Sequence, residues 1–133
     1  EMGVFTRKGS FPDVPQKELP FVVPAEPLND APTRIRGLDG WPEDAYKRKV
    51  KYEVTLLESA LELCRQGKAA GYFPKFVVEE HNLRVKSEFQ LERRRSPYAG
   101  RVCTTDVYLV KRKVQRESAE IKQIAKAIRL VCN

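Results

Sequence analysis

Short apolar runs alternate along the chain with stretches that show helical periodicity. Strands are expected where apolar residues alternate with polar ones, or form brief runs bounded by proline or glycine. These runs are Gly3–Lys8, Pro20–Pro24, Lys49–Val54, Ala69–Phe73, Val85–Glu92 and Asp106–Lys111. Because helical stretches lie between several of these strands, the pattern predicts an α/β fold with right-handed crossovers.

The clearest helix signal lies between residues 55 and 67. Thr55 and Glu58 have the spacing of a capping box, in which the hydroxyl and the carboxylate each accept a free backbone N–H. An apolar stripe at helical spacing follows: Leu56, Ala60, Leu63 and Cys64. Gly67 stands where a residue in the left-handed conformation ends a helix. The pattern predicts a helix from about Leu56 to Gln66.

Three further helices are expected. Asp30 and Pro32 start a short helix that Trp41-Pro42 ends. Pro74 opens another short helix, which reaches about His81. The last helix begins at about Ser118, and its apolar stripe consists of Ile121, Ile124, Ala125, Ile128 and Val131.

The bulk composition is that of one ordinary domain. With 133 residues, of which 41% are apolar, the chain can bury a core of its own. The three cysteines are an odd number and lie far apart, so they predict neither a disulfide framework nor a metal site. A reducing, cytoplasmic location is therefore expected. No apolar run approaches the roughly 18 residues that span a bilayer, and no signal peptide is apparent, so we expect no membrane partner and a piece of a longer protein.

The net charge of +7 is unevenly distributed. Residues 1–45 carry 5 basic and 8 acidic side chains, whereas residues 46–133 carry 20 and 10. Acidic residues are interleaved almost everywhere, which favours a solvated mixed surface. The uninterrupted basic runs, Arg93-Arg94-Arg95 and Lys111-Arg112-Lys113, keep an alternative open: a small basic nucleic-acid-binding domain whose affinity falls steeply with salt.

The sequence contains no recognisable catalytic set. His81 is expected to be solvated or to cap a short helix, and no nucleophile is paired with it. Glu79 and Glu80 are adjacent, so on a helix their side chains diverge by about 100° and cannot act as a carboxylate pair. We therefore expect no enzyme, no cofactor and no metal site.

Four motifs occur in a distinctive order along the chain. They are Leu19-Pro20-Phe21-Val22-Val23-Pro24; Glu53-Val54-Thr55 leading into Ala60-Leu61-Glu62-Leu63-Cys64-Arg65-Gln66-Gly67; Tyr72-Phe73-Pro74; and Val107-Tyr108-Leu109-Val110 followed by a helix through Ile121, Lys122 and Ile128. In this order they resemble the second subdomain of the effector-binding domain of LysR-type transcriptional regulators. Ala69 departs from the family, which often has a second glycine there.

The resemblance implies a periplasmic-binding-protein-like (type 2) lobe with a mixed, mainly parallel sheet flanked by helices. Residues 9–105 would form the second subdomain, 3–8 and 106–112 the two crossover strands, and 117–132 the terminal helix. The N-terminal DNA-binding domain of the family is absent, so contact with DNA would depend on that missing part. The partner of the terminal helix would be the absent first subdomain, and without it the helix is expected to seek another surface, such as a second copy of the chain.

The resemblance also implies a function and a site. Family members sense a small effector, often an organic anion, in a cleft between two subdomains, and they act as homo-oligomers. Ligands of open α/β sheets lie outside the carboxyl ends of strands, where helix N-termini present free N–H groups. The candidate effector-binding residues are therefore Pro24, Ala25 and Glu26 after one strand, and Thr55, Leu56 and Leu57 after the next. Thr55 either caps its helix only or also lines the cleft, and residues 24–26 form either a plain loop or the cleft rim.

Overall fold

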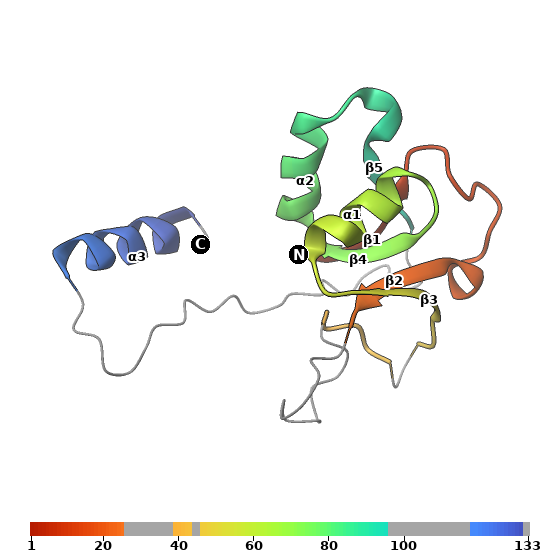
Figure 1. Ribbon diagram of the computed structural model, residues 1–133, viewed down its shortest axis with the longest axis horizontal. Helices are drawn as coiled ribbons and strands as arrows, with labels where there is room; N and C mark the ends of the chain where they lie inside the picture. The colour runs from red at the N-terminus through yellow and green to blue at the C-terminus, as the bar shows by residue number, and fades with distance from the viewer. Residues whose placement is uncertain (26–38, 44–45, 96–117, 132–133) are drawn as a thin grey trace.

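The computed structural model describes residues 1–25, 39–43, 46–95 and 118–131, which form a five-stranded sheet and its helices (Figure 1). The strands are β1 (Met2–Arg7), β2 (Pro20–Pro24), β3 (Lys49–Val54), β4 (Ala70–Pro74) and β5 (Leu91–Arg93). The α-helices are α1 (Leu57–Arg65), α2 (Lys75–Arg84) and α3 (Ala119–Val131), and two 3₁₀ turns are η1 (Gln16–Glu18) and η2 (Ser87–Phe89). The bounds of β1 to β4 differ from the predicted ones by at most one residue.

The sheet has the strand order β3-β2-β4-β1-β5. β2 lies parallel to both β3 and β4, whereas β1 is antiparallel to both β4 and β5. Four of these five strands therefore run in one direction, and β1 is inserted between two of them in the opposite sense. The predicted α/β class with a mixed sheet is confirmed.

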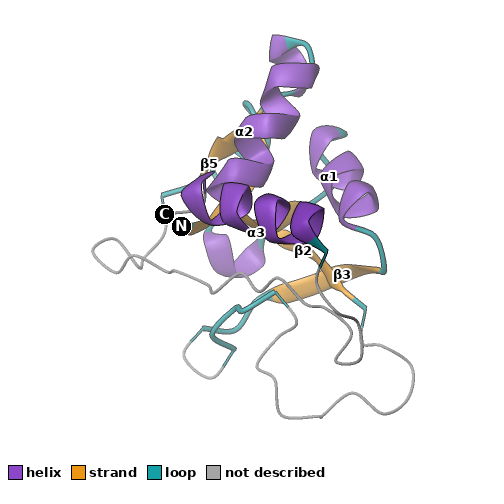
Figure 2. Cartoon of the chain, turned by 90° about the vertical axis from the view of Figure 1, so that its left-hand side faces the viewer, coloured by secondary structure: helices purple, strands orange, loops and turns teal. Residues whose placement is uncertain are grey.

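The helices α1 and α2 cover one face of the sheet (Figure 2). Ala60 and Cys64, from the predicted stripe of α1, are buried there against apolar side chains of the strands. These side chains include Phe5, Val22 and Phe73, and α2 adds Val78. Burial of this stripe is the main source of stability for a helix of only nine residues, which would not persist alone in water.

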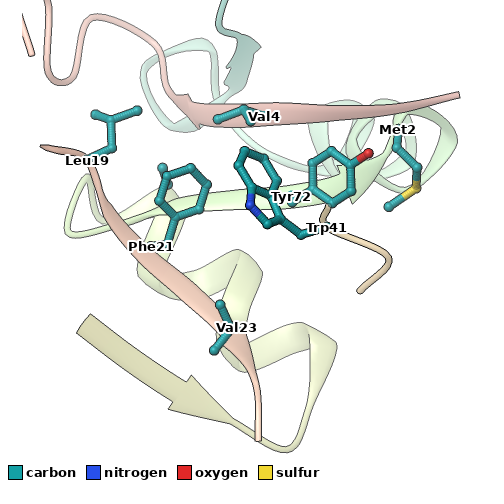
Figure 3. Packing of buried hydrophobic residues seen from close by; sticks show 8 residues of the cluster. Met2, Val4, Leu19, Phe21, Val23, Trp41 and Tyr72 are labelled. Carbon is teal, nitrogen blue, oxygen red and sulfur yellow. The ribbon is translucent and has the colours of Figure 1, made fainter. Parts of the chain in front are cut away.

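An aromatic cluster fills the opposite face of the sheet. Figure 3 shows the Trp41 ring between Phe21 of β2 and Tyr72 of β4, with ring centroids 5.3 Å and 5.1 Å apart, respectively. The Trp41 side chain is only 1% exposed, and its indole N–H donates to the carbonyl of Tyr46 at 2.7 Å. The sequence pattern indicated Trp41 only as the end of a helix, whereas in the fold it is the largest fully buried residue.

A buried ion pair fixes the segment that carries Trp41. The side chains of Arg48 and Asp39 are 2% and 7% exposed, and the guanidinium donates to both Asp39 oxygens, at 2.5 and 3.1 Å. Arg48 also donates to Glu43 at 2.8 Å, and its guanidinium carbon lies 5.2 Å from the centre of the Trp41 ring. Asp39 in turn accepts the Trp41 backbone N–H. The charge is thus surrounded by partners, which a buried charge requires.

The predicted end of α1 is confirmed at Gly67. Gly67 has φ +70°, its N–H donates to the Cys64 carbonyl, and the Lys68 N–H donates to the Leu63 carbonyl. This pair of bonds is the Schellman motif, which satisfies carbonyls that a helix end leaves free. A Cβ at Gly67 would also lie 2.8 Å from the Ser10 hydroxyl, so both conformation and space require glycine here.

The predicted strand Val85–Glu92 is wrong in most of its length. Helix α2 continues to Arg84, three residues beyond its expected end, and β5 contains only Leu91–Arg93. The side-chain amide of Asn82 donates to the Leu91 carbonyl and accepts the Leu91 N–H, both at 2.9 Å. This contact aligns only the last residues of the segment with β1, whose own end at Arg7 limits the ladder.

The predicted terminal helix is confirmed as α3, and the Ser118 hydroxyl lies within 3.4 Å of the Ile121 N–H at its start. Several of its large apolar side chains are exposed: Ile121, Ile124, Ile128 and Leu130. The predicted helix after Asp30 and the predicted strand Asp106–Lys111 lie outside the described residues. Within the described ranges, each helix is too short or too polar to cross a bilayer.

Removal of Arg48 should destabilise the fold strongly. The variant R48M leaves the Asp39 carboxylate buried without its cation, a change that costs about 3–5 kcal/mol. Urea unfolding can be followed by the fluorescence of Trp41, the single tryptophan of the chain. The double variant R48M/D39N should be more stable than R48M, because no unpaired charge remains. R84M, which removes an exposed cation, is the control, and equal midpoints for R48M and R84M would contradict the prediction.

Cys64 should be chemically inert in the folded chain. Its side chain is fully buried, and burial raises the pKa of the Cys64 thiol to about 12, so almost no thiolate forms at neutral pH. In a C103S/C132S background, a disulfide reagent should modify Cys64 only at the rate at which the protein opens, and rapidly in urea. Rapid modification without denaturant would show that α1 does not cover this position.

Candidate functional site

The carboxyl ends of three neighbouring parallel strands lie at one edge of the sheet, called here the carboxyl edge. Pro24 of β2 is in register with Val54 of β3, and the Ala25 N–H donates to the Val54 carbonyl at 2.8 Å. β4, parallel to β2 on its other side, ends at Pro74. The structure therefore brings the predicted site residues Pro24 and Ala25 next to Thr55, although Ala25 and Thr55 are 30 positions apart in the sequence. Glu26 lies outside the described residues.

Two helices begin at the carboxyl edge. α1 starts at Leu57, three residues after β3, and α2 starts at Lys75, directly after β4 (Figure 1). Neither helix start has a side-chain cap. The Lys75 N–H is satisfied by the Glu1 carbonyl at 2.8 Å, whereas α1 keeps the uncapped first turn that a helix N-terminus offers to anions.

The predicted capping box of Thr55 is wrong. The residue in the cap position is Leu56, with φ −113° and ψ 136°, and no side chain hydrogen-bonds to the first turn. Val54 is still part of the sheet ladder and accepts the Ala25 N–H, so the chain needs Thr55 to turn away from the strand. The helix consequently starts one residue later than the motif requires, and Glu58 no longer occupies the position from which it could reach back.

The carboxyl edge also exposes two large apolar side chains. Leu56 and Leu57 are 60% and 45% exposed, respectively, and only Thr55 separates them from the half-buried Val54. Adjacent exposed leucines beside uncapped N–H groups form a surface with an apolar part and a polar part. Such a combination is typical of one wall of a small-molecule site.

The nearby cations are already paired. Lys75 forms an ion pair with Glu79 at 3.3 Å, and Arg93 forms one with Glu1. The hydrogen bond from Arg93, followed by the charge of the same guanidinium, lowers the pKa of Glu1. An anion at this edge would therefore interact mainly with backbone N–H groups among the described residues.

His81 lies away from this edge, in the last turn of α2, and is partly buried rather than solvated. Burial and then the charge of Arg65 lower the pKa of His81, and its Nε2 is buried without a hydrogen-bond partner in the described part of the chain. A neutral imidazole in such surroundings fits a packing role. In the same residues, no group of three or more His, Cys, Asp or Glu side chains is placed to hold a metal ion.

The first basic run is largely used within the fold. Arg93 pairs with Glu1, and Arg94 is partly buried and donates to the Val14 carbonyl at 3.0 Å. Of this run, only Arg95 makes no such contact with the described residues. The second run, Lys111-Arg112-Lys113, lies outside them.

Substitution of Thr55 should hardly change stability. Because its hydroxyl caps nothing, T55A should lower the free energy of unfolding by less than about 0.5 kcal/mol, whereas loss of a true cap costs about 1 kcal/mol. At the other end of α1, G67A should cost more than about 1 kcal/mol, because alanine is strained at φ +70°. Urea unfolding of both variants measures the difference, and a larger loss in T55A than in G67A would refute this account of α1.

Comparisons of the chain with protein-family models, with curated proteins and with solved structures found no match. The functional assignment therefore depends on the sequence motifs and on the geometry of the described residues.

Proposed function

We propose that the chain is the effector-sensing and dimerisation part of a LysR-type bacterial transcription regulator, a cytoplasmic protein. In this proposal it forms a periplasmic-binding-protein-like (type 2) lobe, and the carboxyl edge is one wall of an inter-subdomain cleft. The ligand is a small organic anion. The residues that contact it are Pro24, Ala25, Glu26, Thr55, Leu56 and Leu57.

The observation that carries the proposal is the alignment of β2 and β3 at their carboxyl ends. The register of Pro24 with Val54 places Ala25, the residue after β2, beside the turn that leads into α1. Ligands of open α/β sheets bind at such edges, where a loop and a helix N-terminus converge. The described candidate residues, Pro24, Ala25, Thr55, Leu56 and Leu57, follow two different strands and lie at one edge of the sheet, which supports the proposal.

The motifs of the resemblance also correspond to real elements. The run that ends at Pro24 is β2, the segment from Glu53 to Gly67 is the end of β3 followed by α1, and the run that ends at Pro74 is β4. The fourth motif is described only in its helical part, α3. The motifs thus form a strand, a strand followed by a helix, and a strand, in the order that the family resemblance implies. Together they support the proposed family more than one motif would alone.

The chemistry of the edge suits a carboxylate attached to an apolar body. The N–H groups of Leu57, Glu58 and Ser59, at the positive end of the α1 dipole, would donate to the carboxylate. Leu56 and Leu57 would contact the apolar body, whose burial adds roughly 25 cal/mol per Å². A ligand held between this wall and a first subdomain would bind the closed cleft more tightly than the open one. This difference in affinity would shift the equilibrium toward the closed state and so change the arrangement of attached DNA-binding domains.

The exposed apolar side chains of α3 fit the same scheme. A helix with four large exposed apolar residues normally has a partner surface. In the proposal this partner is the first subdomain in the longer protein, and a second copy can take its place when that subdomain is absent.

Nucleic-acid binding by the chain itself has less support. Two of the three arginines of the first basic run make contacts within the fold, so they are not free to neutralise phosphates. This alternative predicts binding to duplex DNA that falls linearly with salt on logarithmic axes, a dependence that fluorescence anisotropy measures directly.

An acidic residue at the start of α1 should weaken anion binding without destabilising the fold. L56D puts a carboxylate in the cap position, where it should stabilise α1 by about 1 kcal/mol and also occupy the N–H groups that the anion needs. In a titration of the ¹⁵N-labelled chain with acetate and benzoate, the amides of residues 57–59 should shift saturably, with benzoate binding more tightly. In L56D these shifts should be at least tenfold weaker at equal ligand concentration.

L83D is the matched control, because Leu83 is exposed on α2 and the substitution changes the charge equally. It should bind both acids as the unmodified chain does. Absence of shifts at residues 57–59, or equal binding by L56D and L83D, would refute the proposed site. Strong, salt-sensitive DNA binding in the same samples would favour the alternative function.

A further inference from the structure

A hollow lies at the opposite edge of the sheet from the carboxyl edge. It is lined by Arg7, Lys8, Ser87, Glu88 and Phe89 and has a volume of about 730 Å³. The hollow is wide enough for a small organic molecule but largely open to solvent, so a ligand there would be only partly enclosed. None of these residues belongs to the carboxyl edge, so an inference about the hollow does not rest on the function proposed above.

Backbone hydrogen bonds hold the two walls of the hollow together. The Lys8 N–H donates to the Gln90 carbonyl at 2.8 Å, which joins the end of β1 to the segment directly after η2. The Ser10 N–H donates to the Arg7 carbonyl at 2.9 Å and closes a turn in which Gly9 has φ +73°. The Gly9 N–H donates in turn to the carboxylate of Glu92 at 3.1 Å. The walls are thus fixed by the sheet rather than by the ligand.

Arg7 is held in place and keeps donors available. Its Nε donates to the Ser10 hydroxyl at 3.2 Å, and its guanidinium carbon lies 3.0 Å from where a Cβ on Gly67 would be. The absence of a side chain at Gly67 therefore leaves room for the guanidinium. Its other two nitrogens have no hydrogen-bond or ion-pair partner in the described part of the chain. A guanidinium in this state presents two donors in a geometry that matches a carboxylate.

The Phe89 ring is held in place by a cation–π contact. The guanidinium of Arg65 lies 5.1 Å from the ring centre, and two hydrogen bonds from Arg65 to Glu62, at 2.6 and 2.7 Å, hold that guanidinium in place. Phe89 is only partly buried and lines the hollow. It offers an apolar surface whose position does not depend on a ligand.

The charges that line the hollow are of both signs and do not neutralise one another. Arg7 and Lys8 are cationic and Glu88 is anionic, yet none of the three forms an ion pair within the described ranges. An organic anion would leave Glu88 unmatched, and an organic cation would leave Arg7 and Lys8 unmatched. A ligand that carries both charges close together would match all three.

We propose that this hollow binds a free α-amino acid with an apolar side chain. Its carboxylate interacts with Arg7 and Lys8, its ammonium group with Glu88 and the Ser87 hydroxyl, and its side chain packs against Phe89. The site is separate from the carboxyl edge and would allow the chain to respond to a second small molecule.

Three ligands of nearly the same shape test the charge pattern. The full chain, labelled with ¹⁵N, is titrated with L-phenylalanine, with 3-phenylpropanoate, which lacks the ammonium group, and with 2-phenylethylamine, which lacks the carboxylate. The amides of Lys8 and of Ser87–Phe89 should shift saturably with phenylalanine at millimolar concentration. Each analogue should bind more weakly by up to about fivefold, the loss expected when one solvent-exposed ion pair is removed.

Two charge-neutralising variants test whether Glu88 recognises the ammonium group of the ligand. E88Q should lose the preference for phenylalanine over 3-phenylpropanoate, whereas E53Q, an equal change on the exposed face of β3, should retain it. Equal affinities for the three ligands, an unchanged preference in E88Q, or no shifts at Lys8 and Ser87–Phe89 would each overturn the proposal. Shifts confined to residues 57–59 would overturn it too, while supporting the carboxyl edge as an anion site, so the two sites are judged separately.

Discussion

The position of β2 between two parallel strands is the constraint on which the rest of the structure depends. Phe21, Val22 and Val23 are buried, with Phe21 and Val22 directed to opposite faces of the sheet. A strand with both faces covered must be central, and a central strand fixes the register of both neighbours. That register aligns the ends of β2, β3 and β4 and so creates the carboxyl edge. On the other side of β4, β1 runs in the opposite direction, so its last residue, Arg7, lies at the edge opposite the carboxyl edge.

The two faces of the sheet are stabilised by different means. One face is covered by the amphipathic helix α1, whose buried stripe is an ordinary apolar contact. The other is covered by the Trp41 segment, which depends on a buried charge: Arg48 is enclosed by Asp39, Glu43 and aromatic rings. Because a buried ion pair rarely contributes net stability over apolar packing, we infer that this pair serves to hold the segment in one arrangement. The segment directly precedes β3, so this restriction also fixes where β3 enters the sheet.

The two candidate sites at opposite edges use different chemistry for a structural reason. Helix starts gather at the carboxyl edge, so backbone N–H groups are the donors there, and the neighbouring cations are neutralised by Glu79 and Glu1. Helix α1 ends at the other edge, where Arg7 is placed against Gly67 beside a turn and a 3₁₀ segment. Cations near a helix C-terminus are favoured by the dipole, and here they also retain donors for a ligand.

The sequence by itself determined the features that have local causes. Periodicity located β1 to β4, α1 and α3, a left-handed glycine ended α1 at Gly67, and proline ended β2 and β4. The resemblance and the strand ends pointed to Pro24, Ala25, Glu26, Thr55, Leu56 and Leu57, but only the parallel register brought the described ones among them to one edge. The start of α1, the shortness of β5 and the burial of Trp41 and Arg48 were decided by tertiary contacts, as was the hollow beside Phe89. Each of these depends on residues distant in sequence or on competition between a local motif and the sheet, and a local pattern carries no information about such contacts.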